Sequence, residues 1–307
     1  MLSIFGSINL DVSVRSKRLP RAGETVLGSC ALLSPGGKGA NQAHAAQRFG
    51  VPTRLFGMVG DDAFAGPALA GLRRAGVQLD GVGVAPRVPT GLAIISVANG
   101  GDNAIVVAPG ANLAARAAQV SDEALQASRA LLLQLEVPSV ESFMLARRAR
   151  RLGCKVMLNA SPLPPGLLLE AAAIDLLIVN SVELDQLCTL RQTYGIDPMD
   201  KARALASALQ LDVLVTLGAE GSCLAQRDGG HAAARALDVP VIDTTGAGDT
   251  YAGVFAAAIA RGDPPQQAME LASVAAGLAC TQPGAQLAQP DRGAVEAQLL
   301  QHRKDSP

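Results

Sequence analysis

Residues 243–250 read DTTGAGDT, and the apolar stretch that follows, Tyr251 to Arg261, predicts a helix. The glycine and two prolines beyond Arg261 end this helix, because neither residue type continues a helical backbone well. Glycines let backbone N–H groups approach a ligand closely, and a helix start adds unpaired N–H donors with partial positive charge. The stretch therefore predicts a phosphate or oxyanion site with the carboxylate of Asp249 beside it.

An anion site next to a candidate base is typical of phosphoryl transfer. The alternative is an ordinary capped helix, because Asp at a helix start complements the helix dipole. Capping alone does not require a glycine on each side of Ala247, which favours the functional interpretation.

The composition argues against several classes of protein. The chain has 307 residues, 49% of them hydrophobic, which suits one large domain with an appendage or two domains. A net charge of −1, no long basic run and 3% aromatic residues argue against nucleic-acid binding. The apolar stretches are too short to span a bilayer, and Met1 leads straight into a predicted strand without a signal-peptide pattern. We therefore expect a cytoplasmic protein that binds neither nucleic acid nor membrane.

The five cysteines are scattered and include no C-x-x-C pair, which argues against a disulfide framework and structural zinc. We expect them to be small buried hydrophobic residues. The three histidines suggest no metal cluster or catalytic triad, and His44 is expected at the surface or in packing.

Short apolar runs alternate with helical stretches from residue 131 onward. The expected strands are 131–135, 155–158, 176–179 and 213–217. The expected helices are 140–152, 183–190 and 201–209. This alternation predicts a doubly wound, mainly parallel α/β sheet with helices on both faces.

Non-hydrophobic residues follow the four predicted strands, namely Glu136, Asn159, Asn180 and Gly218. Ligands of open α/β sheets bind beyond the carboxyl ends of the strands, so these residues are expected to share one crevice. The alternative is that polar residues simply begin loops.

Two stretches, 12–34 and 91–107, lack helical periodicity. The second contains two strand-like runs around NGGD at residues 99–102, a composition typical of a hairpin turn. We expect these stretches to form a small sheet inserted into a single domain that spans 1–307. The Ala-rich segment 114–130 is a candidate helix.

A second glycine-rich turn, GGKGANQA at residues 36–43, leads into another helix. It is not a Walker A loop, because no Ser or Thr follows Lys38. Asn9 and Asp11 follow the first strand, and with Asn41 they offer amides and a carboxylate for the hydroxyls of a polyhydroxy compound. Lys38 would contact a transferring phosphate. An ordinary loop is the alternative.

The two motifs, in this order, resemble the PfkB carbohydrate kinases over essentially the whole chain, and most of all the ribokinase branch. The matches specific to that branch are residues 6–11 (GSINLD), 20–26 (PRAGETV), 36–43, 89–91 (PTG), 110–112 (GAN) and 134–136 (QLE). The resemblance implies a ribokinase-like α/β domain with a small β lid, which often pairs two subunits as a homodimer.

The resemblance also implies site residues. Asp249 would be the base that takes the proton of the sugar's primary hydroxyl. The N–H groups of an anion hole for the γ-phosphate of ATP would come from Gly246, Ala247 and Gly248. The residues that hold the sugar would be Asn9, Asp11, Gly37, Lys38, Asn41 and Glu136.

The remaining implied residues concern ATP and cations. Asn180 and Glu183 match an N-x-x-E motif that organises Mg²⁺ and phosphate through water, and Asn180 would also contact ATP. The other residues lining the ATP site would be Thr216, Gly218 and Gly221. A K⁺ site that activates the enzyme would include Asp243, Thr245 and Gly284. Ala288 stands where similar ribokinases often have a serine of that site.

The activity implied by the resemblance is ATP-dependent phosphorylation of D-ribose at the 5-hydroxyl. One alternative is a related kinase acting on deoxyribose, another sugar or a nucleoside. Another is a non-catalytic sensor of a sugar or nucleotide, which would not need base and Mg²⁺ elements together. A Rossmann dehydrogenase is disfavoured, because no predicted strand is followed by G-x-G-x-x-G.

Overall fold

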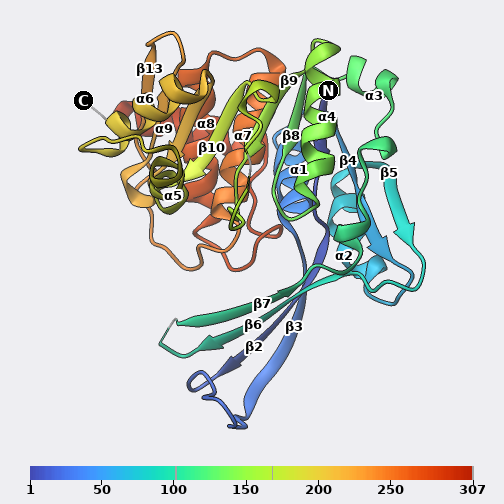
Figure 1. The fold of residues 1–307 in the computed structure, drawn as a ribbon. Coiled ribbons are helices and arrows are strands. Elements are labelled where there is room, and N and C mark those ends of the chain that lie inside the picture. The colour runs from blue at the N-terminus through green and yellow to red at the C-terminus, as the bar shows by residue number, and fades with distance from the viewer. Residues whose placement is uncertain (101, 168, 306–307) are drawn as a thin grey trace.

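The computed structural model describes residues 1–100, 102–167 and 169–305. Within these residues, a large sheet and a small sheet are joined near β1 and β2 (Figure 1). In spatial order the large sheet consists of β13 (His231–Ala234), β12 (Ser222–Ala225), β11 (Asp212–Thr216), β10 (Leu176–Asn180), β9 (Lys155–Asn159), β8 (Ala130–Leu133), β1 (Leu2–Phe5), β4 (Thr53–Gly60) and β5 (Gln78–Ala85).

The large sheet is parallel from β5 to β11, and only β12 and β13 pair antiparallel. The strands that the sequence predicted as β8 to β11 are confirmed. Each is a short apolar run that is buried on both faces, as parallel strands between two layers of helices must be.

Helices cover both faces of the large sheet and form two cores. One core contains residues of α1 (Lys38–Arg48), α2 (Ala65–Ala75), α7 (Ala247–Arg261), α8 (Pro265–Ala279) and α9 (Arg292–Asp305). The other contains residues of α3 (Asp122–Gln126), α4 (Ser139–Arg151), α5 (Ser181–Arg191) and α6 (Pro198–Leu209). Side chains alternate between them, so that Ile4 packs in the first core and Phe5 in the second.

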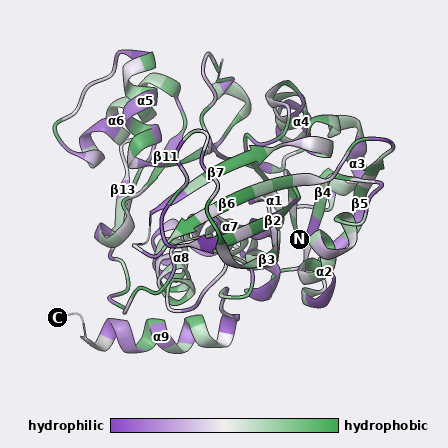
Figure 2. Ribbon diagram, turned by 90° about the horizontal axis from the view of Figure 1, so that it is seen from below, coloured by the Kyte–Doolittle hydropathy of each residue, from purple (hydrophilic) through white to green (hydrophobic). Residues whose placement is uncertain are grey.

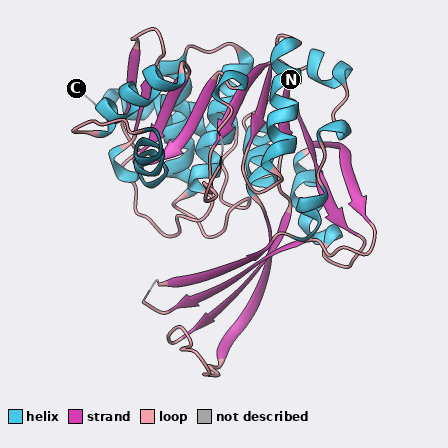
Figure 3. Cartoon of the chain, in the orientation of Figure 1, coloured by secondary structure: helices cyan, strands magenta, loops and turns pink. Residues whose placement is uncertain are grey.

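The small sheet extends away from the main body (Figures 1 and 3). Its order is β3 (Gly28–Gly36), β2 (Asn9–Ser16), β6 (Gly91–Ala98) and β7 (Asn103–Ala108). β2 pairs antiparallel with β3 but parallel with β6, so the sheet is mixed. Hydrophobic residues run along β6 and β7 (Figure 2). Gly101, in the predicted turn at 99–102, lies outside the described residues.

The predicted helix over 114–130 is wrong. Helix α3 covers only Asp122–Gln126. Before it, one 3₁₀ turn ends at Ala114 and another spans Ala117–Gln119, and the extended residues Ala115 and Val120 follow the first and the second turn, respectively. Both extended side chains are fully buried, and the guanidinium of Arg148 donates to the carbonyls of Ala117 and Val120. Tertiary contacts here override the high helix propensity of alanine.

The cysteines only partly follow the prediction. All five are free, and Cys154, Cys188 and Cys223 are buried, whereas Cys30 is exposed on β3 and Cys280 is half-buried. Across the residues that the structure describes, no helix combines the length and apolar character needed to cross a membrane.

Candidate active site

The turn before α7 has the geometry of an anion site. Gly246 has φ 74°, and a Cβ there would lie 2.8 Å from the Cβ of Ala285, so only glycine fits. The N–H of Ala247 donates to the carbonyl of Thr244 at 3.2 Å. In the part of the chain that the structure describes, the N–H groups of Gly246 and Gly248 have no acceptor. A Cβ on Gly248 would meet nothing within 4 Å, so this helix end faces open space.

The start of α1 packs directly against the link between β1 and β2. Gly37, with φ 89°, caps the helix, and a Cβ there would lie 2.8 Å from the N of Asn9 and 2.9 Å from the O of Ser7. A Cβ on Gly39 would lie 2.6 Å from the carbonyl carbon of Gly6. The glycines at 37 and 39 therefore allow the start of α1 to pack closely against the link between β1 and β2.

Asp249 is held where α1 and α7 meet. It is 8% exposed, and its two oxygens accept hydrogen bonds from Asn41 Nδ2 and Gln42 Nε2, each at 3.0 Å. The Nζ of Lys38 lies 4.0 Å from Asp249 Oδ1. Attraction to Asp249 outweighs the effect of burial and, with the charges of Glu136 and Glu183, raises the pKa of Lys38. The site thus combines a fixed carboxylate with a permanent cation.

Two further carboxylates lie nearby. Glu136 accepts hydrogen bonds from the Ser7 hydroxyl and from the backbone N–H of Lys38. Burial, with repulsion from Glu136 and Asp249, raises the pKa of Asp11 to about 7. Gly36 leaves room for Asp11, since a Cβ there would lie 2.2 Å from the Asp11 carboxylate. This group of acceptors suits the hydroxyls of a sugar.

Asn9 is buried and oriented by Asn112. Asn9 Oδ1 accepts from Asn112 Nδ2 at 2.7 Å, and Asn112 Oδ1 accepts from the backbone N–H of Ile8 at 2.8 Å. The side-chain oxygen of Asn9 thus accepts one hydrogen bond within the protein, and its NH₂ group is available to donate to a ligand.

Asn180 and Glu183 form a capping box at the start of α5. Asn180 Oδ1 accepts from the N–H of Glu183, and Glu183 Oε2 accepts from the N–H of Asn180, both at 2.9 Å. This is a structural role for both residues of the N-x-x-E motif. The capping box leaves the other carboxylate oxygen of Glu183 without a capping hydrogen bond. The negative charge of Glu183 contributes to the raised pKa of Lys38.

The other residues predicted for an ATP site lie at and beyond the carboxyl end of β11. Thr216 is the register partner of Asn180 across β10 and β11, and Gly218 follows at φ 60°. Gly221 has φ 93°, and a Cβ there would lie 2.1 Å from the carbonyl oxygen of Ala234. Glycine is therefore required at 221 to join β11 to the antiparallel hairpin β12–β13.

The carboxylate of Asp243 forms hydrogen bonds with both the turn before α7 and the segment around Gly284, which are far apart in sequence. Its Oδ1 accepts from the N–H and the hydroxyl of Thr245, and its Oδ2 accepts from the N–H of Gly284 at 2.8 Å. Burial opposes ionisation, but these hydrogen bonds outweigh it and lower the pKa of Asp243. Among the described residues, no group of three or more His, Cys, Asp or Glu could hold a metal ion.

A family model described as pfkB family carbohydrate kinase matches residues 1–292. The chain belongs to the pfkB family of carbohydrate kinases.

Relatives of this pfkB-family kinase resemble it over nearly its whole length. Ribokinase of Arabidopsis thaliana is 35% identical over 308 residues, which covers 96% of this chain and 79% of the relative. The structure of Thermotoga maritima ribokinase matches with a TM-score of 0.90 and 29% identity, covering 98% of this chain and 99% of that one. Arabidopsis thaliana ribokinase complexed with ribose and ATP matches with a TM-score of 0.86 and 31% identity, covering 97% and 98%. The predicted family and fold class are confirmed.

The structure of this pfkB-family kinase gathers most of the predicted site residues into three groups. Around the anion turn and α1 lie Asp249, Lys38, Asn41, Gly37, Glu136, Asn9 and Asp11. At the carboxyl ends of β10 and β11 lie Asn180, Glu183 and Thr216, with Gly218 and Gly221 beyond. Asp243, Thr245 and Gly284 form the third group.

Sequence reasoning missed a buried amide network behind Asp249. Gln42 Nε2 donates to both Asp249 and Asn159 Oδ1 at 3.0 Å, and Gln42 Oε1 accepts from Gln134 Nε2 at 2.6 Å. Gln42 and Gln134 are fully buried, whereas Asn159 was expected only as part of a crevice. The sequence feature that could have indicated this network is the position of Gln42 directly after Asn41 in the second glycine-rich motif. This network fixes the orientation of the Asp249 carboxylate.

Proposed function

We propose that this pfkB-family kinase transfers the γ-phosphoryl group of ATP to the 5-hydroxyl of D-ribose, giving ribose 5-phosphate and ADP. One observation carries the proposal: Asp249, fixed by Asn41 and Gln42, stands beside Lys38 at an open helix N-terminus. The relatives named ribokinase, one of them complexed with ribose and ATP, support the choice of substrates.

The chain's own groups supply positioning and charge. Asp249 accepts the proton of the attacking hydroxyl, while Lys38 and the N–H groups of Gly246 and Gly248 stabilise charge on the phosphoryl group. Phosphoryl transfer has a loose transition state, so placing the nucleophile in line matters more than the strength of the base. A carboxylate held by two amides meets that need.

Sugar recognition comes from the acceptors around Asp11. The carboxylates of Asp11 and Glu136 accept hydrogen bonds from sugar hydroxyls, and charged acceptors make these bonds strong. The amide groups of Asn9 and Asn41 add directional contacts, and Gly37 lets the backbone approach the sugar. Because Asp11 lies on β2, the small sheet contributes directly to the sugar pocket.

The residues present fit a Mg²⁺ that is bound chiefly through the phosphates of ATP. Mg²⁺ in such sites keeps several waters and uses only one or two protein carboxylates. Glu183 would hold such a water through the oxygen that the capping box leaves, and the ion would neutralise phosphate charge. Thr216, Gly218 and Gly221, at the carboxyl end of β11, would line the ATP site.

We also propose that K⁺ binds at the turn that Asp243 organises. Asp243, Thr245 and Gly284 are already connected there, and Gly246 follows directly, so a cation would stiffen the anion site. Ala288 is buried and offers no side-chain oxygen, so backbone carbonyls would have to complete the site. ATP as donor and five free thiols favour a cytoplasmic location.

Coupled ADP release with MgATP tests the activity. The acceptors would be ribose, 2-deoxyribose, fructose, adenosine and pseudouridine, each with and without K⁺. A clear preference for ribose supports the proposal. A preference for deoxyribose or a nucleoside would leave the assignment of the catalytic residues in place but overturn the assignment of the residues that hold the sugar. Sugar or nucleotide binding without turnover would favour a sensor.

The activity is expected to depend on pH through Asp11. Its charged form binds hydroxyls better, so kcat/KM for the sugar should rise as pH increases through about 7. Stability should change in the opposite sense. The pKa of Asp11 in the folded state lies above its ordinary value of 3.8, so its contribution is complete below that value and lost as pH rises through about 7.

The check is the pH profile of kcat/KM, together with thermal unfolding of the sugar-free protein. Asp11→Asn should remove both dependences near pH 7. An unchanged inflection in that variant would assign it to another group.

The small sheet offers a surface for a second copy of the chain. Leu33 pairs with Val12, Val12 with Ile94, and Ile94 with Val106, so these side chains form an apolar row on one face. Leu33, Ile94 and Val106 are 59%, 52% and 69% exposed. Asp11 points to the opposite face, because side chains alternate along a strand. We propose a homodimer in which this apolar face is buried.

Light scattering after size exclusion should therefore give a dimer for the wild type. The double variant Ile94→Asp and Val106→Asp should be a monomer, because it places charges in the interface. Val140→Asp on α4, also exposed, is the matched control and should remain a dimer. A monomeric wild type, or a double variant that stays dimeric, would contradict this interface.

A further inference from the structure

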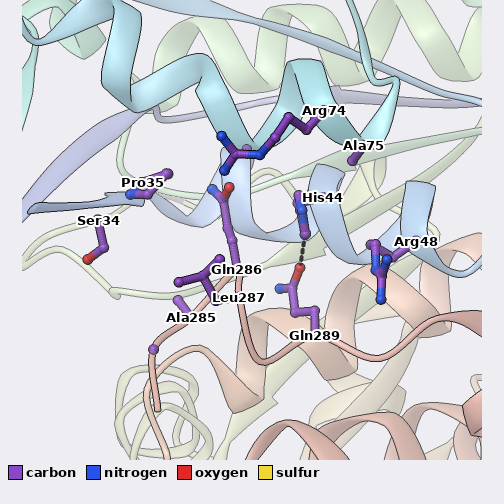
Figure 4. Close-up of a pocket in the computed structure, with 12 residues that line it drawn as sticks. Ser34, Pro35, His44, Arg48, Arg74, Ala75, Ala285, Gln286, Leu287 and Gln289 are labelled. Carbon is purple, nitrogen blue, oxygen red and sulfur yellow. Dashed lines mark hydrogen bonds between the residues drawn. The ribbon is translucent and has the colours of Figure 1, made fainter. Parts of the chain in front are cut away.

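A pocket of about 240 Å³ lies between α1, α2 and the segment 284–289 (Figure 4). Its polar wall consists of His44, Arg48, Arg74, Gln286 and Gln289 together with Ser34. Asp249 and the sugar-binding side chains do not line it. This pocket is therefore next to the candidate active site but distinct from it.

The charged groups of this pocket are positive. Arg48 and Arg74 come from neighbouring helices, and no Asp or Glu is among the described residues that line the pocket. The guanidinium of Arg48 forms a long ion pair with the carboxylate of Asp291, with 3.8 Å between Nη2 and Oδ2. For Arg74, no ion pair occurs within the ranges that the structure describes. The pocket thus attracts an anion.

Gln286 presents an acceptor that the protein leaves unused. It is 4% exposed, and its Nε2 donates to Asn41 Oδ1 at 3.2 Å, but its Oε1 has no donor. Gly71 makes room for this oxygen, since a Cβ there would lie 2.3 Å from it. In Figure 4 the amide end of Gln286 points toward the guanidinium of Arg74. A buried oxygen without a donor is costly, so a ligand donor would be favourable here.

His44 supplies a second acceptor. Its Nδ1 lies 2.6 Å from Gln289 Oε1, and Gln289 Nε2 donates to the carbonyl of Asn41 at 3.0 Å. Because an amide oxygen only accepts, the proton of neutral His44 is on Nδ1 and the lone pair is on Nε2. Burial, with the charges of Arg48 and Arg74, lowers the pKa of His44 and keeps the ring neutral.

We propose that this pocket binds a small phosphate-type anion that also carries hydroxyl groups. Anionic oxygens would bind Arg74 and Arg48, and hydroxyls would donate to Gln286 Oε1 and His44 Nε2. Hydrogen phosphate and a small phosphate ester share this chemistry. Pockets for drug-sized ligands measure about 300–1,000 Å³, so a cavity of about 240 Å³ suits a ligand smaller than a nucleotide.

Histidine NMR on the full chain tests this directly, because the chain has only three histidines. The probes are inorganic phosphate, glycerol 3-phosphate and, as an uncharged control, glycerol. The signals of His44 should shift saturably with either phosphate and not with glycerol, whereas those of His231 and His302 should not move. His44→Gln identifies the His44 signals by their loss.

Arginine variants assign the binding to this pocket. Arg74→Ala and Arg74→Gln should each weaken the apparent Kd about tenfold, the effect of losing a hydrogen bond to a charged group. Arg73→Ala, also an exposed arginine of α2 but not part of the pocket wall, should leave Kd unchanged. Tighter binding of glycerol 3-phosphate would indicate a phosphate ester, and tighter binding of phosphate the free anion. No shift of His44, or equal shifts in wild type and both Arg74 variants, would overturn the proposal.

Discussion

Asp249→Asn should lower kcat by about 10²–10⁴-fold, the usual contribution of a positioned acid or base. Binding of ATP and of sugar should change little, because the variant keeps the size of the side chain and the helix start. The amide cannot accept the hydroxyl proton, and it also turns an NH₂ group toward one of the donors, Asn41 or Gln42. Steady-state kinetics gives kcat, and calorimetry gives the affinity for each substrate.

Asp263→Asn is the matched control for this prediction. Asp263 follows the other end of α7, about 20 Å along the helix, and pairs with Arg261. This variant should keep wild-type kcat. If Asp249→Asn retained near-normal kcat, Asp249 would not be the base, and its buried hydrogen bonds would have a structural role instead.

Gly37→Ala is expected to lower kcat/KM by more than about 100-fold, since shifts near 1 Å at a catalytic site have effects of that size. The new Cβ would lie 2.8 Å from the N of Asn9 and 2.9 Å from the O of Ser7, both backbone atoms that cannot turn aside. The start of α1 would have to move away from β2. Lys38 and Asn41 would then lose their places beside Asp249, and thermal unfolding should occur at lower temperature.

Gly153→Ala is the control that separates the effect of backbone strain from the effect of the steric clash at Gly37. Gly153 has φ 80°, close to the 89° of Gly37, but a Cβ at Gly153 would meet nothing within 4 Å. Residues with this φ cost about 1–3 kcal/mol when they are not glycine, so both variants should lose stability. Only Gly37→Ala should lose activity. Equal activity in the two variants would show that the approach of α1 to the β1–β2 link is not needed.

Local pattern was sufficient for much of the fold. The apolar runs at 131–135, 155–158, 176–179 and 213–217 correspond to β8 to β11, because strands buried on both faces need continuous apolar sequence. Helix α7 ends at Gly262, whose φ of 104° suits glycine alone. Local pattern failed at 114–130, where buried contacts around Arg148 break an alanine-rich segment.

The candidate site was predictable as residue types but not as a set of contacts. Asn41 and Asp249 stand more than 200 positions apart, and only folding shows that their side chains bond. The buried partners Gln42 and Gln134 look like any polar residues in sequence, because nothing local reveals which amides meet. The catalytic and binding roles assigned to these residues stay predictions.

The sequence by itself determined the parallel α/β class and the two glycine-rich helix starts, because periodicity and glycine placement act over a few neighbouring residues. The family followed from the resemblance of its motifs to those of the pfkB kinases. Only the tertiary structure decided that the carboxylate of Asp249 is clamped by Asn41 and Gln42, and that an arginine-lined pocket lies beside Gln286. These features depend on distances between segments remote in sequence, and such distances are set by packing of the whole chain.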